Sequence, residues 1–160
     1  MHNKHIFIVD AENAELAIWK VKTELELDES LTSNNWYSVC GAVDTVSGAY
    51  TLNDDYRECD ELKTIEGINK EINEFISKER YEKLKAQLQE SVDKHQWHMA
   101  EYYAKQLDGI EVATHTGFDL KKNIVDINEF DKFSFGVTIW TENENNDDLS
   151  LFAVIVDFHS

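Results

Sequence analysis

Proline is absent from this sequence, and the residues that commonly interrupt or crosslink a chain are scarce: among 160 residues there are six glycines and two cysteines. Without proline there is no proline-rich linker, and the sequence contains neither a repeat nor a second domain. A chain of this length typically buries about 68–70% of its unfolded surface, which is enough for one hydrophobic core. We therefore expect residues 1–160 to form a single domain.

Basic residues are also few, with 15 Lys and Arg against 32 Asp and Glu, so that the net charge is −17. Such a chain repels phosphate backbones and anionic membranes, which excludes direct binding to nucleic acid or to a membrane surface. The composition nevertheless includes 42% hydrophobic and 11% aromatic residues, too many for a disordered acidic chain. The sequence predicts a folded acidic protein.

Long apolar runs are missing, and none approaches the roughly 20 residues that a membrane-spanning helix needs. The start of the chain, "MHNKHIFIVD", has only four consecutive apolar residues before Asp10, too few for a signal peptide. We therefore expect a cytoplasmic protein. Cys40 and Cys59 belong to no CxxC or zinc-finger pattern, and we expect them to be reduced thiols without a special role.

The first third of the chain predicts a strand, a helix and a hairpin. Residues 5–9, "HIFIV", form a short apolar run typical of a buried strand. Asp10 is a candidate N-cap for a helix over residues 11–25, whose helically spaced apolar residues are Leu16, Trp19 and Leu25. After it, Ser47-Gly48 lies between two β-rich segments and predicts a tight turn, while Gly41 in the first segment indicates a bulge.

Helical spacing then dominates residues 55–107, where Gly67 is the only strong helix breaker. An unbroken helix of that span would be about 75–80 Å long, whereas a domain of this size is about 40 Å across. The helical spacing of apolar residues is interrupted at residues 77–79, so we place a break there with Ser77 as the new N-cap. We expect Asp108-Gly109 to end the second helix. The apolar stripe consists of Leu62, Ile65, Ile68, Ile72, Phe75, Leu84, Leu88, Val92, Met99 and Tyr102.

The last third returns to β patterns, with short candidates at residues 110–115 and 123–127 and clearer ones at 133–140 and 149–158. Residues 133–140 alternate, with Phe133, Phe135, Val137 and Ile139 on one face, and 149–158 has the continuous apolar centre of an inner strand. The predicted fold class is α+β. We expect an antiparallel sheet of about four to six strands, one N-terminal helix, and a long helical hairpin inserted before a C-terminal β-hairpin.

The stretch "KHQWHMAEYY", residues 94–103, is the one candidate for metal chemistry, because His95, His98 and Glu101 could share a helix face. It lacks the HExxH pattern of zinc proteases, and His95 also continues the apolar stripe, so we interpret the stretch as a helix face. A calcium loop ending at Glu129 fails because its sixth position is Asn123 instead of glycine. No phosphate-binding glycine loop or GxSxG motif occurs, and we expect neither a cofactor nor a metal site.

Acidic residues gather in three segments. Residues 24–29, "ELELDE", hold four carboxylates, residues 54–61, "DDYRECDE", hold five with one arginine, and residues 142–148 hold four. Carboxylates arrayed on a helix face or along a loop can imitate the phosphates of a nucleic-acid strand and fill a basic groove. The alternative is a solvated surface that keeps the protein soluble, which the interleaved lysines of residues 63–85 favour for the long helices.

Residues 91–107 differ from the rest of the chain, because their charges sum to zero and they contain Trp97, Met99, Tyr102 and Tyr103. These side chains are typical of interface cores. Four large side chains on neighbouring positions cannot all face inward on one narrow helix face, so we expect some at the surface. We predict that Trp97, Tyr102 and Tyr103 belong to an oligomer or partner interface, and that residues 84–103 mediate a homodimer.

Together these patterns favour a non-catalytic acidic protein that blocks a basic protein partner, such as a nucleic-acid-binding enzyme. Phages and mobile elements use inhibitors of this kind against host defence, and bacteria use them as immunity factors. The predicted partner-binding residues are Asp54, Asp55, Glu58, Asp60, Glu61, Glu142, Glu144, Asp147 and Asp148. Two alternatives remain open: a small metal-dependent enzyme using His95, His98 or His115 with nearby carboxylates, and a structural subunit that forms homo-oligomers.

Overall fold

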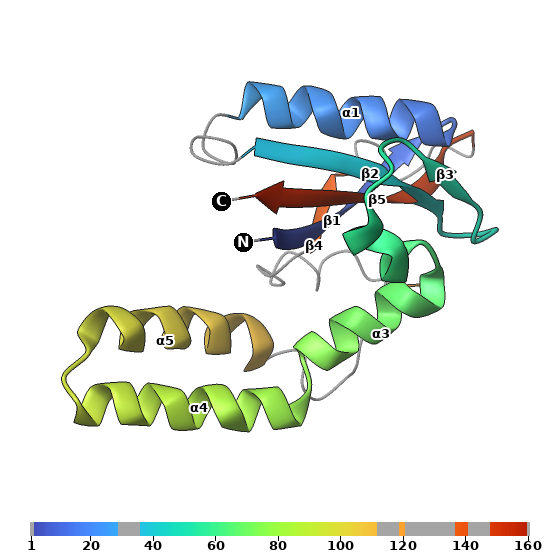
Figure 1. The fold of residues 1–160 in the computed structure, drawn as a ribbon. Coiled ribbons are helices and arrows are strands. Elements are labelled where there is room, and N and C mark those ends of the chain that lie inside the picture. The colour runs from blue at the N-terminus through green and yellow to red at the C-terminus, as the bar shows by residue number, and fades with distance from the viewer. Residues whose placement is uncertain (1, 29–35, 112–118, 121–136, 141–147, 160) are drawn as a thin grey trace.

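A five-stranded sheet with helices packed on both faces, and a helical hairpin beside it, makes up the described part of the chain (Figure 1). The computed structural model describes residues 2–28, 36–111, 119–120, 137–140 and 148–159. The predicted α+β class and the N-terminal strand and helix are confirmed. The elements are β1 (His2–Ala11), α1 (Ala14–Leu27), β2 (Trp36–Asp44), β3 (Tyr50–Leu52), the 3-10 helix η1 (Arg57–Leu62), α3 (Ile65–Phe75), α4 (Lys78–Asp93), α5 (Trp97–Glu111), β4 (Val137–Trp140) and β5 (Ser150–His159).

The strand order is β3-β2-β5-β1-β4, with β5 at the centre. β5 runs antiparallel to both β1 and β2, but β4 runs parallel to β1, so the sheet is mixed instead of wholly antiparallel. The predicted C-terminal β-hairpin is therefore not formed by these two strands, because β1 lies between β4 and β5. Residues 112–115, 123–127 and 133–136 lie outside the described residues, and residues 110–111 end α5.

Alternation along the central strands produces two hydrophobic layers. Ile6 and Ile8 of β1 join Ala153 and Ile155 of β5 on the face covered by η1 and α3. The intervening residues, Phe7, Val9, Val154 and Val156 among them, face α1. Successive side chains of a strand point to opposite faces, so a continuously apolar strand can serve both layers. This explains why residues 6–9 and 152–156 are buried throughout.

Helix α1 differs from its predicted cap and apolar stripe. Its N-cap is Asn13, whose side-chain oxygen accepts the backbone N–H of Leu16 at 2.9 Å, whereas Asp10 is buried at the end of β1. Leu16 and Trp19 are 40% and 62% exposed. The spacing of apolar residues shows that a helix has an apolar side, but it does not show which of several apolar sides packs on the sheet. Here the smaller residues Ala17, Ile18 and Val21 form the packed face with Leu25.

The predicted hairpin between β2 and β3 is confirmed, but its connection spans residues 45–49 and is longer than the tight turn predicted at Ser47-Gly48. Gly48 has a φ of 77°, a left-handed conformation that glycine adopts without strain. The pairing of β2 with β5 shifts register between Val39 and Gly41, which confirms an irregularity at the predicted bulge. A Cβ atom on Gly41 would lie 2.3 Å from the Thr51 carbonyl oxygen, so β3 can approach this closely only because residue 41 has no side chain.

The helical region breaks once where predicted and twice where it was not, at residues 63–64 between η1 and α3 and at residues 94–96. Ser77 caps α4 by accepting the backbone N–H of Arg80 at 3.2 Å, which confirms the break between α3 and α4. The hairpin turn itself lies at residues 94–96, between α4 and α5, with His95 at a φ of 56°. Gly109 does not end α5, which continues to Glu111. None of the helices in the described residues is both long and apolar enough to cross a bilayer.

Cys40 and Cys59 form a disulfide, so the expectation of two reduced thiols is wrong for this structure. Both side chains are buried, and their Cα atoms lie 6.6 Å apart. The crosslink ties η1 to β2, across a sequence separation of 19 residues. Two isolated cysteines carry no spacing signal for such a bond, because it is the packing of η1 on the sheet that brings them together.

We predict that this disulfide stabilises the protein by about 2–4 kcal/mol, since it restricts the unfolded chain. Dithiothreitol should lower the urea midpoint of the oxidised wild type and leave that of a Cys40→Ala, Cys59→Ala double variant unchanged. Free thiols in wild-type protein that has been purified and unfolded without reductant would show that the bond does not form.

His5 on β1 provides a pH-dependent term in the stability of the sheet. Its Nε2 lies 2.8 Å from the Thr138 hydroxyl of β4, and burial lowers the pKa of His5 to about 4. The unfolded state therefore binds more protons between about pH 4 and 6.5, so stability falls as the pH is lowered through that window.

We predict that the free energy of unfolding falls less for a His5→Gln variant than for wild type when the pH is lowered through this range. The difference between the two falls should reach up to about 3 kcal/mol. Urea unfolding at several pH values between 4 and 7 would measure the difference. Carboxylates also titrate in this range, but they are common to both proteins. Parallel pH profiles for wild type and variant would contradict a neutral, buried His5.

Candidate functional site

The acidic segment of residues 54–61 leads from β3 through η1 and is held in place on both sides. Cys59 and Leu62 of η1 are buried, and the disulfide fixes Cys59 to β2. The five predicted partner-binding carboxylates of this segment all remain exposed: Asp54, Asp55, Glu58, Asp60 and Glu61. A rigid support with exposed carboxylates is the arrangement that a partner could read as a fixed charge array.

Few cations neutralise this segment. Lys63 pairs with Asp60, and Lys4 lies 3.4 Å from Glu61. Surface pairs of this kind contribute only about 0–1 kcal/mol. The side chains of Asp54 and Asp55 form no ion pair among the described residues. Counting Arg57 within the segment and these two lysines, its five carboxylates keep a net charge of −2.

The other acidic segments are only partly described. Glu142, Glu144 and Asp147 lie outside the described residues, and Asp148 is exposed just before β5. Glu24, Glu26 and Asp28 are exposed at the end of α1. The structure therefore brings the predicted residues of the 54–61 segment together, and it does not test whether the 142–148 segment joins them.

The helical hairpin exposes the aromatic residues that the sequence singled out. Trp97 is 61% exposed and Tyr102 54% exposed, which confirms that some of the four large side chains face outward, whereas Tyr103 is half-buried. His95 lies in the turn and not on a helix face, so the predicted continuous helix face over residues 94–103 is wrong. His98 is exposed on α5, and Glu101 pairs with Lys105 at 2.8 Å.

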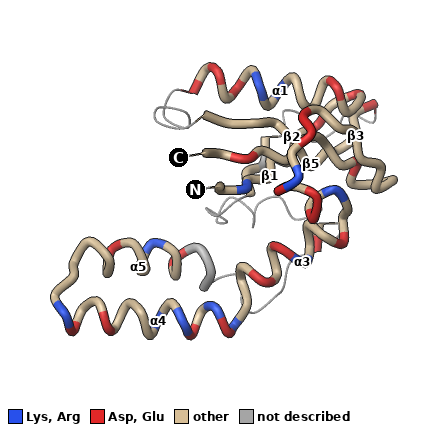
Figure 2. Tube along the Cα trace, viewed as in Figure 1, with Lys and Arg blue, Asp and Glu red and all other residues tan. Residues whose placement is uncertain are grey.

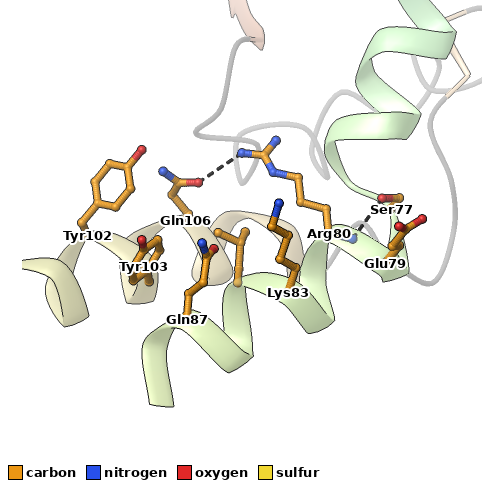
Figure 3. Close-up of a pocket in the computed structure, with 9 residues that line it drawn as sticks. Ser77, Glu79, Arg80, Lys83, Gln87, Tyr102, Tyr103 and Gln106 are labelled. Atoms are coloured by element: carbon orange, nitrogen blue, oxygen red, sulfur yellow. Dashed lines mark hydrogen bonds between the residues drawn. The ribbon is translucent and has the colours of Figure 1, made fainter. Parts of the chain in front are cut away.

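A cleft of about 460 Å³ lies between α4 and α5 (Figure 3). Arg80 crosses it, donates to Gln106 Oε1 at 3.1 Å, and has its guanidinium centre 3.6 Å from the Phe75 ring centroid. Partial burial lowers the pKa of Arg80. Because Arg80 already bonds to Gln106 and stacks on Phe75, its main role is to hold α5 against the end of α3.

A second cluster, which sequence analysis missed, lies where β1 and β2 begin and β5 ends. The register pairs His2 of β1 with His159 of β5, and His159 with Trp36 of β2. Asp157 lies two residues before His159 on the same face. Nδ1 of His2 lies 2.9 Å from Oδ2 of Asp157, and Nε2 of His159 lies 3.3 Å from the same oxygen. We call His2, Asp157 and His159 the histidine cluster.

Two residues from the 54–61 segment border this cluster. The Tyr56 hydroxyl lies 3.0 Å from His2 Nδ1 and 3.5 Å from His159 Nδ1, and Glu58 Oε2 lies 3.2 Å from His2 Nδ1. Partial burial and the negative charges of Asp157 and Glu58 raise the pKa of Tyr56, so its phenol stays protonated. Trp36 stacks on His159 with ring centroids 3.8 Å apart and fixes the imidazole plane.

The histidine cluster has one faint signal in the sequence. Asp157 is the only charged residue in the apolar run of residues 149–158, and an acidic residue in an inner strand needs a partner. Its partner His2 is 155 positions away, so the pairing becomes visible only once β1 and β5 are aligned.

Chemically, the cluster offers two imidazole nitrogens and one carboxylate oxygen, all within 4.8 Å of one another. It is the only such group of potential metal ligands among the described residues. The 54–61 segment instead offers charge without a convergent donor set. No protein-family model, no curated protein and no solved structure matches the chain.

Proposed function

We propose that this protein is a non-catalytic acidic binding protein that blocks a basic protein partner, with a nucleic-acid-binding enzyme as the partner class that fits best. The observation that carries the proposal is the 54–61 segment, in which five exposed carboxylates stand on a disulfide-anchored support. Holding charges in a fixed array before binding reduces the ordering cost of association. It also provides the electrostatic complementarity that speeds encounter with a basic surface.

The distribution of charge supports a binding role for the sheet side of the molecule. The path from β3 into η1 carries five carboxylates and one arginine, and α1 carries three glutamates and two lysines, whereas acidic and basic residues balance along α4 (Figure 2). A surface that served solubility alone would need no such separation. The mixed charges of α4 match the solvated helix that the sequence predicted, and we leave α4 out of the proposed binding surface.

Helix α1 adds an apolar anchor beside the acidic segment. Lys22 of α1 donates to Asn53 Oδ1 at 3.1 Å, which brings the start of the segment alongside the helix. Trp19 is 62% exposed, and Glu15 and Glu26 lie at helical spacing from Trp19 and Lys22 on the outer face. An exposed tryptophan among charges is typical of interaction hot spots, so we include Trp19 in the proposed surface.

The expected cytoplasmic location stays part of this proposal, and the Cys40–Cys59 disulfide bears directly on it. Structural disulfides persist mainly in oxidising compartments. A buried disulfide shielded from reductants is still compatible with a partner in the cytoplasm, because thiol exchange requires access to a sulfur atom. The thiol measurement described above, made on protein from cytoplasmic extract, therefore also tests the location.

We predict that neutralising the 54–61 segment weakens capture of basic proteins. The test variant carries Asp54→Asn, Asp55→Asn, Asp60→Asn and Glu61→Gln, and keeps Glu58 because it contacts His2. Immobilised wild-type protein should capture basic proteins from a nuclease-treated bacterial extract at low salt and release them at high salt. The variant should associate with an isolated partner about tenfold more slowly and show a flatter salt dependence.

The matched control removes the same charge from the helices, where lysines are interleaved. It carries Glu74→Gln, Glu82→Gln, Glu90→Gln and Asp93→Asn, all at exposed positions. This control should retain capture. Equal losses in both variants would mean that net charge alone matters, and unchanged binding in both would show that the acidic segment serves only solubility.

We also propose a homodimer through the helical hairpin, because it leaves Val92, Trp97 and Tyr102 exposed. Light scattering at high micromolar concentration should give twice the monomer mass, and Trp97→Ala should shift it towards the monomer without lowering the melting temperature. Tyr103→Ala is the comparison, since its half-buried ring should contribute to stability in either state. A monomer mass for wild type would rule out the dimer.

A further inference from the structure

The histidine cluster buries a carboxylate that forms no ion pair with a Lys or Arg in the described part of the chain. Asp157 is completely buried, and its Oδ1 has no hydrogen-bond partner in the described part of the chain. No Lys or Arg among the described residues pairs with it; the groups that face its charge are the two imidazoles and the Tyr56 hydroxyl. A buried carboxylate without a compensating cation is strongly destabilising.

The surroundings of His2 add further oxygen atoms that need a hydrogen-bond donor or a cation. Its Nδ1 faces Asp157 Oδ2, Glu58 Oε2 and the Tyr56 hydroxyl at 2.9, 3.2 and 3.0 Å. One ring nitrogen carries at most one proton and cannot donate well to all of these oxygens. Nε2 of His159 likewise has no hydrogen-bond partner among the described residues, although it lies beside Asp157. A cation placed between His2 Nδ1, Asp157 Oδ2 and His159 Nε2 would give the buried carboxylate a positive partner and His159 Nε2 a ligand bond.

We propose that His2, Asp157 and His159 form a binding site for a divalent transition-metal ion, with zinc as the best-fitting ion. Two imidazoles and one carboxylate are a donor set that zinc uses when a further position remains open to water. Ligand atoms around tetrahedral zinc lie about 3.3 Å apart. The distances of His2 Nδ1 and His159 Nε2 from Asp157 Oδ2, 2.9 and 3.3 Å, match this spacing.

The outer groups fit the same assignment. Trp36 holds the His159 ring, and the Tyr56 hydroxyl can accept a hydrogen bond from Nδ1–H of His159, which leaves Nε2 free for the ion. The His2 side chain is 37% exposed, so an ion can reach the site from solvent. Glu58, which is half exposed, can supply a further oxygen ligand by a small side-chain movement. The assignment does not depend on the acidic binding function.

The test uses untagged full-length protein that has been stripped with a chelator and then dialysed. Titration with zinc, followed by calorimetry and by competition with a chromogenic chelator, should give one ion per chain. Cobalt(II) should give the visible absorption of a tetrahedral site. Excess magnesium should not displace either ion, which separates this site from loose binding to an acidic surface.

Three variants locate the ion: His2→Gln, Asp157→Asn and His159→Gln should each weaken zinc binding by at least about tenfold. His2→Gln changes a partly exposed side chain, so it stays informative if Asp157→Asn fails to fold. A His95→Gln, His98→Gln double variant is the matched control and should bind zinc as wild type does. Absence of zinc and cobalt binding, or binding that the control abolishes and the cluster variants keep, would overturn the proposal.

Discussion

The antiparallel pairing of β1 with β5 is the constraint on which the rest of this structure depends. Ten consecutive residues of each strand are paired, from His2 with His159 to Ala11 with Ser150. The alternation of these two strands supplies both hydrophobic layers, one against α1 and one against η1 and α3. The same register places His2 beside His159. The core and the histidine cluster are thus two results of one alignment.

A net charge of −17 has to be accommodated around that core. The fold separates two kinds of charged surface: α4 carries acidic and basic residues that offset one another, while the 54–61 segment carries five carboxylates and one arginine. The disulfide matters here because, together with the buried Leu62, it holds an acidic 3-10 helix against the sheet in spite of the mutual repulsion of its carboxylates. Charge that would otherwise favour an extended loop is kept in a defined place.

The sequence was sufficient where local physics decides the outcome. The β-rich run at residues 5–9, the hairpin that contains Gly48 and the Ser77 cap depend on neighbouring residues, and each was predicted correctly. It failed where distant segments decide. Trp19 faces outward because the small residues of α1 pack on the sheet, β4 joins β1 instead of β5, and Cys40 meets Cys59 only after η1 has docked. The exposed carboxylates of residues 54–61 were predictable because charge stays at the surface, whereas His2 lies 155 positions from Asp157 and meets it and His159 only across the sheet.

The place of the described ends of the chain has a mechanical consequence (Figure 1). β1 starts beside the point where β5 finishes, and the hydrogen bonds between antiparallel strands run perpendicular to them. A force that pulls these two ends apart therefore breaks the hydrogen bonds between β1 and β5 one pair of residues at a time, so the force required is small. A force that draws β5 along its own axis has to shear it from β1 and β2 together. The protein should thus resist unfolding weakly when its ends are pulled apart and strongly when β5 is pulled along its axis. In the first case the pair that carries His2 and His159 separates first.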